Sequence, residues 1–110
     1  MIRFIDNEPR FVPGDLVRHR RYSYRGLIVA VDCRCRASHE WYMGNRTQPD
    51  QNQPWYHVLV DGSAASTYAA QSNLVPDASD EPLDHPLLEE YFEVLSDGRY
   101  QRNDRQYAGW

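Results

Sequence analysis

Two apolar runs dominate the hydropathy pattern of this chain. Residues 27–31 read Leu-Ile-Val-Ala-Val, and residues 55–60 read Trp-Tyr-His-Val-Leu-Val before an Asp-Gly turn signal. Because strand side chains alternate between faces, the second run has two faces, one with Trp55, His57 and Leu59 and the other with Tyr56, Val58 and Val60. A strand that is apolar on both faces is typically central and covered. The two runs therefore predict paired strands in the middle of a small β-structure.

Weaker patterns predict the remaining elements. Residues 16–19 and 66–70 are expected to form strands, residues 38–43 a helical turn, and residues 71–76 a tight turn that leads into a short last strand. Apolar residues recur at helical spacing from Leu87 to Leu95, which predicts a short helix over about 85–95 with Asp84 as its cap. Residues 99–110 show no clear pattern.

These elements favour a mainly β fold, a small SH3-like antiparallel β-barrel with a long inserted loop at about 33–53. The barrel is expected in residues 1–76, ordered from about residue 11. Residues 77–110 are expected to form an acidic C-terminal extension that contains the short helix. The chain shows neither a signal-peptide pattern nor an apolar run of membrane-spanning length, so we expect a soluble cytoplasmic protein without membrane contact.

The composition adds a charge asymmetry to this picture. The formal net charge is −4, and all twelve cationic residues are arginine. Residues 1–76 carry nine arginines and seven acids, whereas residues 77–110 carry three arginines and nine acids. A mildly basic body with a strongly acidic tail is unlike a uniformly basic nucleic-acid binder.

The densest cationic cluster lies at residues 18–25. Its candidate binding residues are Arg18, His19, Arg20, Arg21, Tyr24 and Arg25, and Arg34, Arg36 and Arg46 extend the basic surface. Guanidinium groups pair with phosphate and tyrosine rings stack on bases, so this cluster suits DNA. Three other interpretations stay open: a solvated loop, a surface that grips acidic protein, and a contact with the chain's own acidic tail.

Other candidate chemistry is weak. Cys33 and Cys35 with His39 lack the spacing and the fourth ligand of a structural zinc site, so no metal is expected, and the two thiols should pack as small hydrophobes if the strand continues. His57 has no activated serine motif to serve, and the chain has no Gly-rich phosphate loop. We therefore expect no catalytic residues and no cofactor.

The long loop carries Trp41, Tyr42 and Met43. Such a group of apolar side chains either pins the loop to the barrel or presents a protein contact.

The order of the motifs resembles the HspQ family, also called YccV-like or hemimethylated-DNA-binding domains. The resemblance rests on Gly14-x-x-Val17-Arg18-His19, on 24–32 (Tyr-Arg-Gly-Leu-Ile-Val-x-Val-Asp), on 54–59 (Pro-Trp-Tyr-His-Val-Leu) and on 67–74 (Thr-Tyr-Ala-Ala-Gln-Ser-Asn-Leu). The residues that match the family motif are Val17, Gly26, Val29, Trp55, Tyr56, His57, Val58, Tyr68 and Leu74.

The resemblance implies a non-enzymatic SH3-like barrel with two alternative roles. The first is binding DNA, including hemimethylated DNA, through the arginine-rich loop. The second is a heat-shock-type adaptor, a stress-response specificity factor that contacts an ATP-dependent protease and its substrates. A homo-oligomer is a further possibility.

Overall fold

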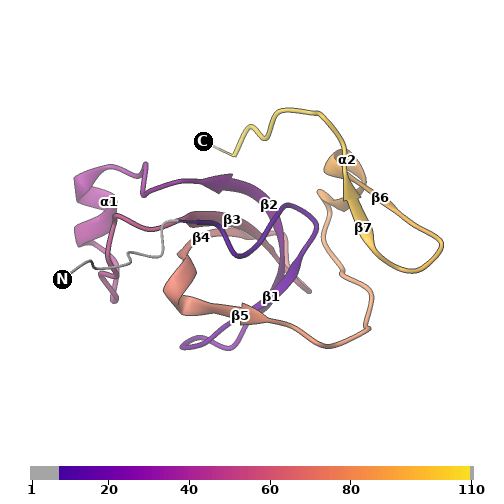
Figure 1. The fold of residues 1–110 in the computed structure, drawn as a ribbon, viewed down its shortest axis with the longest axis horizontal. Coiled ribbons are helices and arrows are strands. Elements are labelled where there is room, and N and C mark those ends of the chain that lie inside the picture. The colour runs from indigo at the N-terminus through magenta and orange to yellow at the C-terminus, as the bar shows by residue number, and fades with distance from the viewer. Residues whose placement is uncertain (1–7, 110) are drawn as a thin grey trace.

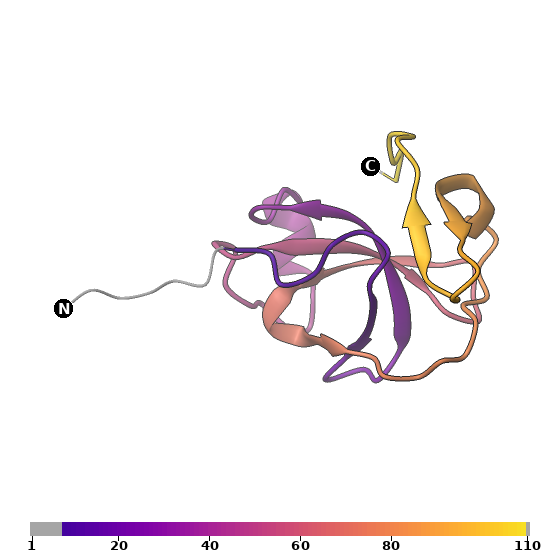
Figure 2. The ribbon, with the colours of Figure 1, turned by 45° about the vertical axis from the view of Figure 1, so that its right-hand side comes forward.

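The computed structural model describes residues 8–109, which form a strongly curved sheet with a C-terminal segment at one end and a short helix at the other (Figure 1; Figure 2). Five antiparallel strands make up the sheet in the order β4-β3-β2-β1-β5. They are β1 (Leu16–His19), β2 (Arg25–Asp32), β3 (Trp55–Val60), β4 (Ser66–Ala70) and β5 (Leu74–Pro76). The mainly β fold predicted from the sequence is confirmed.

The two apolar runs are the central strands β2 and β3, as predicted. Ile28 pairs with Val58, and a bulge at Val29 shifts the register so that Ala30 pairs with His57. Because an extra residue exchanges the two faces of a strand, Val29 faces one apolar cluster and Val31 packs against the other.

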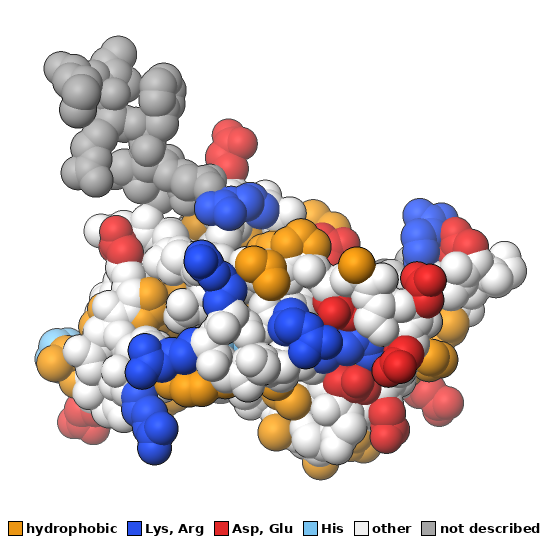
Figure 3. All heavy atoms as spheres, turned by 90° about the horizontal axis from the view of Figure 1, so that it is seen from below, with side chains coloured by type: hydrophobic (Ala, Val, Ile, Leu, Met, Phe, Trp, Pro, Cys, Tyr) orange, Lys and Arg blue, Asp and Glu red, His pale blue; other side chains and the backbone are white. Residues whose placement is uncertain are grey.

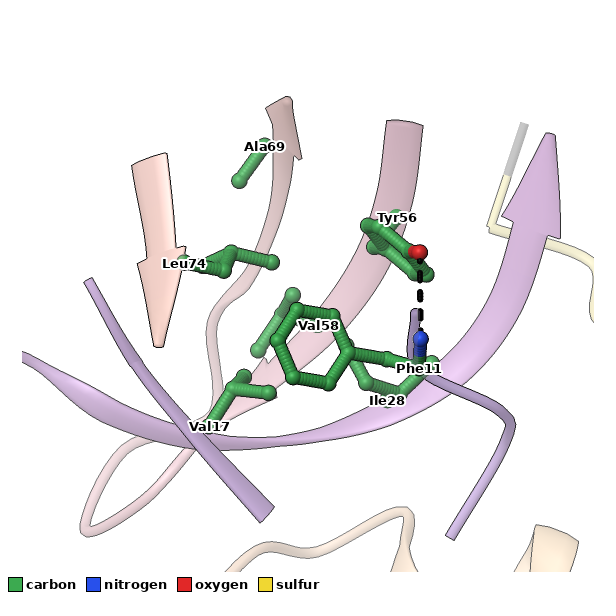
Figure 4. Packing of buried hydrophobic residues seen from close by; sticks show 7 residues of the cluster. All are labelled: Phe11, Val17, Ile28, Tyr56, Val58, Ala69 and Leu74. Carbon is green, nitrogen blue, oxygen red and sulfur yellow. Dashed lines mark hydrogen bonds between the residues drawn. The ribbon is translucent and has the colours of Figure 1, made fainter. Parts of the chain in front are cut away.

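The inner core lies in the concavity of the sheet. It contains Phe11, Val17, Ile28, Tyr56, Val58, Ala69 and Leu74 (Figure 4). The ring of Phe11 meets the ring of Tyr56 edge-on at 5.5 Å, and the backbone N–H of Phe11 donates to the Tyr56 hydroxyl. The segment before β1 therefore covers part of the concave face of the sheet.

A second core lies on the opposite face of β2 and β3. Leu27, Val29 and Leu59 pack there against three residues of the C-terminal segment, Leu83, Tyr91 and Phe92. The apolar residues that recur from Leu87 onward thus pack onto the barrel.

The helix expected over about 85–95 is wrong in its length and its cap. Only α2 (Leu88–Tyr91) is helical; β6 (Phe92–Val94) then pairs with β7 (Tyr100–Arg102), an element the sequence did not predict. A turn at Gly98, whose φ is 85°, allows the chain to reverse and pair β6 with β7. Asp84 caps nothing; its N–H donates to Asp61, and the ring of His85 accepts the N–H of Leu87.

The two edge strands β4 and β5 are joined by a short 3₁₀ helix, η1 (Gln71–Asn73). Within residues 8–109 these two edge strands are not paired with each other in the sheet. Backbone hydrogen bonds between strands therefore do not close the barrel. The predicted helical turn is confirmed as α1 (His39–Met43), whose N-cap Ser38 accepts the N–H of Trp41. This five-residue turn is the longest helix within residues 8–109, and it is far too short to span a membrane.

Candidate nucleic-acid interface

Three arginines of the predicted cluster are exposed: Arg18 in β1, and Arg20 and Arg21 in the turn between β1 and β2. Arg18 donates to the carbonyl of Ser23 at 2.9 Å, and Arg20 donates to the carbonyl of Ser72 at 3.3 Å. Nη2 of Arg18 also lies 3.4 Å from the Asp77 carboxylate. The guanidinium of Arg21 lies 6.0 Å from the ring centroid of Tyr22. On the face that carries β1 and β5, arginine side chains gather over the barrel and acidic side chains over the C-terminal segment (Figure 3). The charge asymmetry of the sequence is thus also an asymmetry in space.

His19 is not part of the exposed surface, because it is buried beneath this turn with 4% of its surface accessible. Its Nδ1 accepts the backbone N–H groups of Arg21 and Tyr22, both at 3.1 Å, so Nδ1 carries no proton. Burial, followed by the charge of Arg21, lowers the pKa of His19. Its ring stacks on Tyr22 at 4.8 Å. His19 therefore fixes the arginine-bearing turn through its Nδ1 atom.

Arg25, expected in an exposed connection, is in fact buried at the start of β2. Its Nε lies 2.6 Å from the Asp77 carboxylate and its Nη1 lies 3.0 Å from Asp61, and Nη2 also donates to the carbonyl of Glu81. Burial alone would lower the pKa of Arg25, but these carboxylates raise it above its ordinary value. Arg25 therefore ties the C-terminal segment to the barrel, and its buried guanidinium is not part of the exposed arginine surface.

The arginines of the long loop are exposed but lie in two places. Arg34 and Arg36 follow β2 directly, and Arg36 Nε is 4.0 Å from Asp32. Arg46 comes after α1, between Asn45 and Thr47.

A groove of about 420 Å³ follows β4, and every residue of that strand lines it. Its other walls come from the β1–β2 turn (His19, Tyr22 and Tyr24), from the long loop (Trp41, Asn45, Thr47 and Pro49), from β3 (Trp55 and His57), from Asn73 and from Gly109. A volume of this size is typical of small-ligand sites. Two predicted site regions, the arginine turn and the aromatic loop, thus meet at one groove.

The aromatic side chains of the loop anchor it at this groove. Trp41 meets the rings of Trp55 at 6.1 Å and Tyr68 at 5.7 Å, both edge-on. Tyr42 donates its hydroxyl to the carbonyl of Pro49, which closes the loop on itself. Met43, in contrast, is 52% exposed. Of the two readings of these side chains, anchoring describes Trp41 and Tyr42, whereas Met43 faces solvent.

A polar network beneath the rings was not foreseen from the sequence. Asp32 accepts the Tyr68 hydroxyl at 2.6 Å and lies 3.3 Å from Nε2 of His57. Burial, followed by the hydrogen bond to Asp32, raises the pKa of Tyr68, whereas burial lowers the pKa of His57 against the opposing effect of Asp32. Tyr24 adds a second bridge, with its hydroxyl 2.8 Å from that of Thr67. These bonds hold the ring-bearing strands in register.

The motif residues divide between structural and groove positions. Val17, Tyr56, Val58 and Leu74 belong to the inner core and Val29 to the second core, whereas Trp55, His57 and Tyr68 line the groove. A Cβ on Gly26 would lie 2.4 Å from a methyl of Val58 and 2.7 Å from the carbonyl oxygen of Leu59, so only glycine fits there.

The two cysteines lie beyond the end of β2, because the strand stops at Asp32. Cys33 is exposed and Cys35 is partly buried, so the condition under which both thiols were expected to pack as small hydrophobes, a strand that continues through them, is not met. No group of three or more His, Cys, Asp or Glu side chains in residues 8–109 is arranged to hold a metal ion.

Sequence reasoning missed the polar residues of the groove, namely Asn45, Thr47, Ser66 and Asn73. They lie in loops or at an exposed strand position, where hydropathy patterns carry no signal. The turn signal around Asn73 showed only that the chain reverses there, since the facing wall comes from segments far away in the sequence.

Comparison with known proteins places the chain in context. Residues 9–99 match the family model described as hemimethylated DNA-binding protein YccV like. The chain is also 36% identical over 94 residues to F-box only protein 21 of Homo sapiens, and to its counterparts in Mus musculus and Pongo abelii. These matches cover 82% of this chain but 15% of each relative, so the chain spans about 15% of the length of these curated proteins. The resemblance drawn from the sequence motifs is confirmed.

Proposed function

Because the chain belongs to the YccV-like family, we propose that it is a non-enzymatic DNA-binding module that holds the phosphate backbone with its β1–β2 turn. The observation that carries this proposal is the turn itself. Arg18, Arg20 and Arg21 are exposed, and the buried ring of His19 fixes the turn by accepting the backbone N–H of Arg21. Ordered guanidinium groups bind phosphate oxygens bidentately and lose less entropy than arginines on a mobile loop.

The charge distribution supports a directional encounter with DNA. Nine acids lie within residues 77–110, and the acidic side chains visible beside the arginine face gather over that C-terminal segment (Figure 3). A polyanion is therefore attracted to the barrel side and repelled from the other. This arrangement offsets the unfavourable net charge of −4.

The test is a fluorescence-anisotropy titration of duplex DNA at several salt concentrations, with unmethylated, hemimethylated and fully methylated duplexes. If about three phosphates are neutralised, the slope of log K against log salt is about −3. The double variant Arg20→Gln/Arg21→Gln should bind more weakly and reduce the slope by about 2.

Arg99→Gln/Arg105→Gln is the matched control, since it removes the same charge from exposed positions of the C-terminal segment. We expect the control to bind as the unsubstituted protein does. Absence of DNA affinity at low salt, or an equal loss in both double variants, would contradict the proposal.

The protease-adaptor role is the second candidate, and Met43 is the observation that favours it. This side chain is 52% exposed on a loop that Trp41 anchors, which is a common arrangement at protein contacts. A Met43→Glu variant should then lose capture of an ATP-dependent protease or its substrates from stressed cells while keeping any DNA affinity. Capture that is unchanged by the substitution would count against a contact through this loop.

A further inference from the structure

The groove along β4 has cationic residues at two of its walls. On one wall Tyr22 is preceded by Arg20 and Arg21, which are exposed. On another wall Asn45 and Thr47 line the groove, and the exposed Arg46 lies between them in the chain. A ligand that spans these walls would present negative charge at both ends and an uncharged middle.

The middle of the groove combines flat rings with hydrogen-bonding side chains. Tyr22 is 46% exposed and stacks on the buried ring of His19, so its position is fixed although it reaches solvent. Within residues 8–109, the side chains of Asn73 and Thr47 and the Oδ1 atom of Asn45 have no hydrogen-bond partner. Amide and hydroxyl groups of this kind read the edges of nucleobases, and aromatic rings stack on their faces.

These features fit one repeating unit of a nucleic-acid strand, with phosphate on either side of a flat polar base. A base inside an intact duplex cannot use them, because its faces are covered by its neighbours and its pairing edge is occupied. The groove is also larger than a contact to a phosphate requires, at about 420 Å³.

We propose that the groove along β4 binds one unpaired or extruded DNA base, with flanking phosphates held by Arg20 and Arg21 on one side and Arg46 on the other. This inference rests on the proposed DNA binding and names its substrate class: DNA that exposes a base, in preference to fully paired duplex. Tyr22 supplies the stacking ring, and Asn45 and Asn73 supply polar contacts to the base edge.

The experiment compares three labelled DNAs of equal length with the full-length protein: a single strand, a duplex with one unpaired base, and the fully paired duplex. Stacking on one ring contributes roughly 5- to 150-fold in affinity, so the first two should bind at least about fivefold more tightly. Since phosphate contacts are shared, the preference should persist between about 50 and 200 mM salt while all affinities fall. A 2-aminopurine at the unpaired position should change its fluorescence on binding.

Tyr22→Leu separates this inference from the proposed function. The exposed ring can be removed without opening the core, and the variant should lose the preference for unpaired bases while keeping its affinity for paired duplex. Val94→Ala, an exposed apolar position outside the groove at 60% exposure, is the control and should keep the preference.

Equal affinity for the three DNAs, or an equal loss on all three in Tyr22→Leu, would overturn the base-binding inference and leave duplex binding in place. Binding of none of them would overturn both, and would favour a protein ligand for the groove.

Discussion

The buried contact of Arg25 with the C-terminal segment gives the sharpest stability prediction. Arg25→Met keeps the length of the side chain but removes its charge. The Asp77 side chain is 5% exposed and that of Arg25 is 7% exposed, so the substitution leaves a buried carboxylate whose remaining ion pair is the longer one with Arg18, at 3.4 Å. Losing one partner of such a pair costs about 3–5 kcal/mol. A domain of this size has about 5–15 kcal/mol in total, so the variant should retain its fold with much of its stability gone.

The assay is urea unfolding followed by tryptophan fluorescence. With an m value of about 2 kcal/mol per molar urea, the midpoint of Arg25→Met should fall by about 1.5–2.5 M. Adding Asp77→Asn should recover part of the loss, because it removes the buried charge that Arg18 alone compensates only in part, whereas the Asp61 side chain is 24% exposed and can be hydrated. Arg99→Met is the control and should leave the midpoint unchanged, since its pair with Asp97 is exposed. A loss in Arg25→Met no larger than in the control, or a double variant less stable than the single one, would refute the reasoning.

Three further predictions concern the sheet, the core and pH. Gly26→Ala should destabilise the protein by more than about 1 kcal/mol in the same urea assay, because its Cβ would meet backbone and a core methyl below 3 Å; an unchanged midpoint would show that the strands move apart easily. Tyr56→Phe should lower the free energy of unfolding measured by calorimetry by about 1–3 kcal/mol, because the hydroxyl bonds both Gln71 and the N–H of Phe11 in the core. An unchanged melting temperature in the variant would argue against a stabilising role of these bonds. The pKa of His19 is lowered in the folded protein, so the unfolded chain takes up the proton first as pH falls. The free energy of unfolding should therefore be constant above pH 6.5 and decline below it. His19→Gln should flatten this decline, and an equally steep pH profile in the variant would assign the decline to other groups.

The sequence alone predicted the strands well because the signal for them is local. Two apolar runs specify β2 and β3, and the Asp61-Gly62 turn specifies the start of the return to β4. The hairpin β6–β7 was missed because its strands have three residues each, and residues 87–95 also satisfy a helical period. The Asp97-Gly98 dipeptide that follows fits the end of such a helix as well as a hairpin turn, so it does not distinguish the two.

The candidate site was harder to predict because it depends on distant parts of the chain. Arg25 looked exposed by its neighbours, and only Asp61 and Asp77, 36 and 52 positions away, make its burial possible. His19 looked like a ligand-binding residue, but two backbone N–H groups occupy its ring nitrogen. Composition identified the arginines and aromatic residues; it could not show which of them face the same groove.

The burial of β2 on both of its faces also determines which fragment of this chain can fold by itself. Leu27 and Val29 face the second core, so a fragment that stops at Pro76 would leave them, with Leu59, against water. Such a fragment should aggregate through this exposed apolar patch, and the shortest fragment that stays monomeric should extend past β7. The barrel and the C-terminal segment are therefore expected to unfold in one cooperative transition. Amide hydrogen exchange in β2 should be slower in the chain that contains both parts than in a fragment that ends at Pro76.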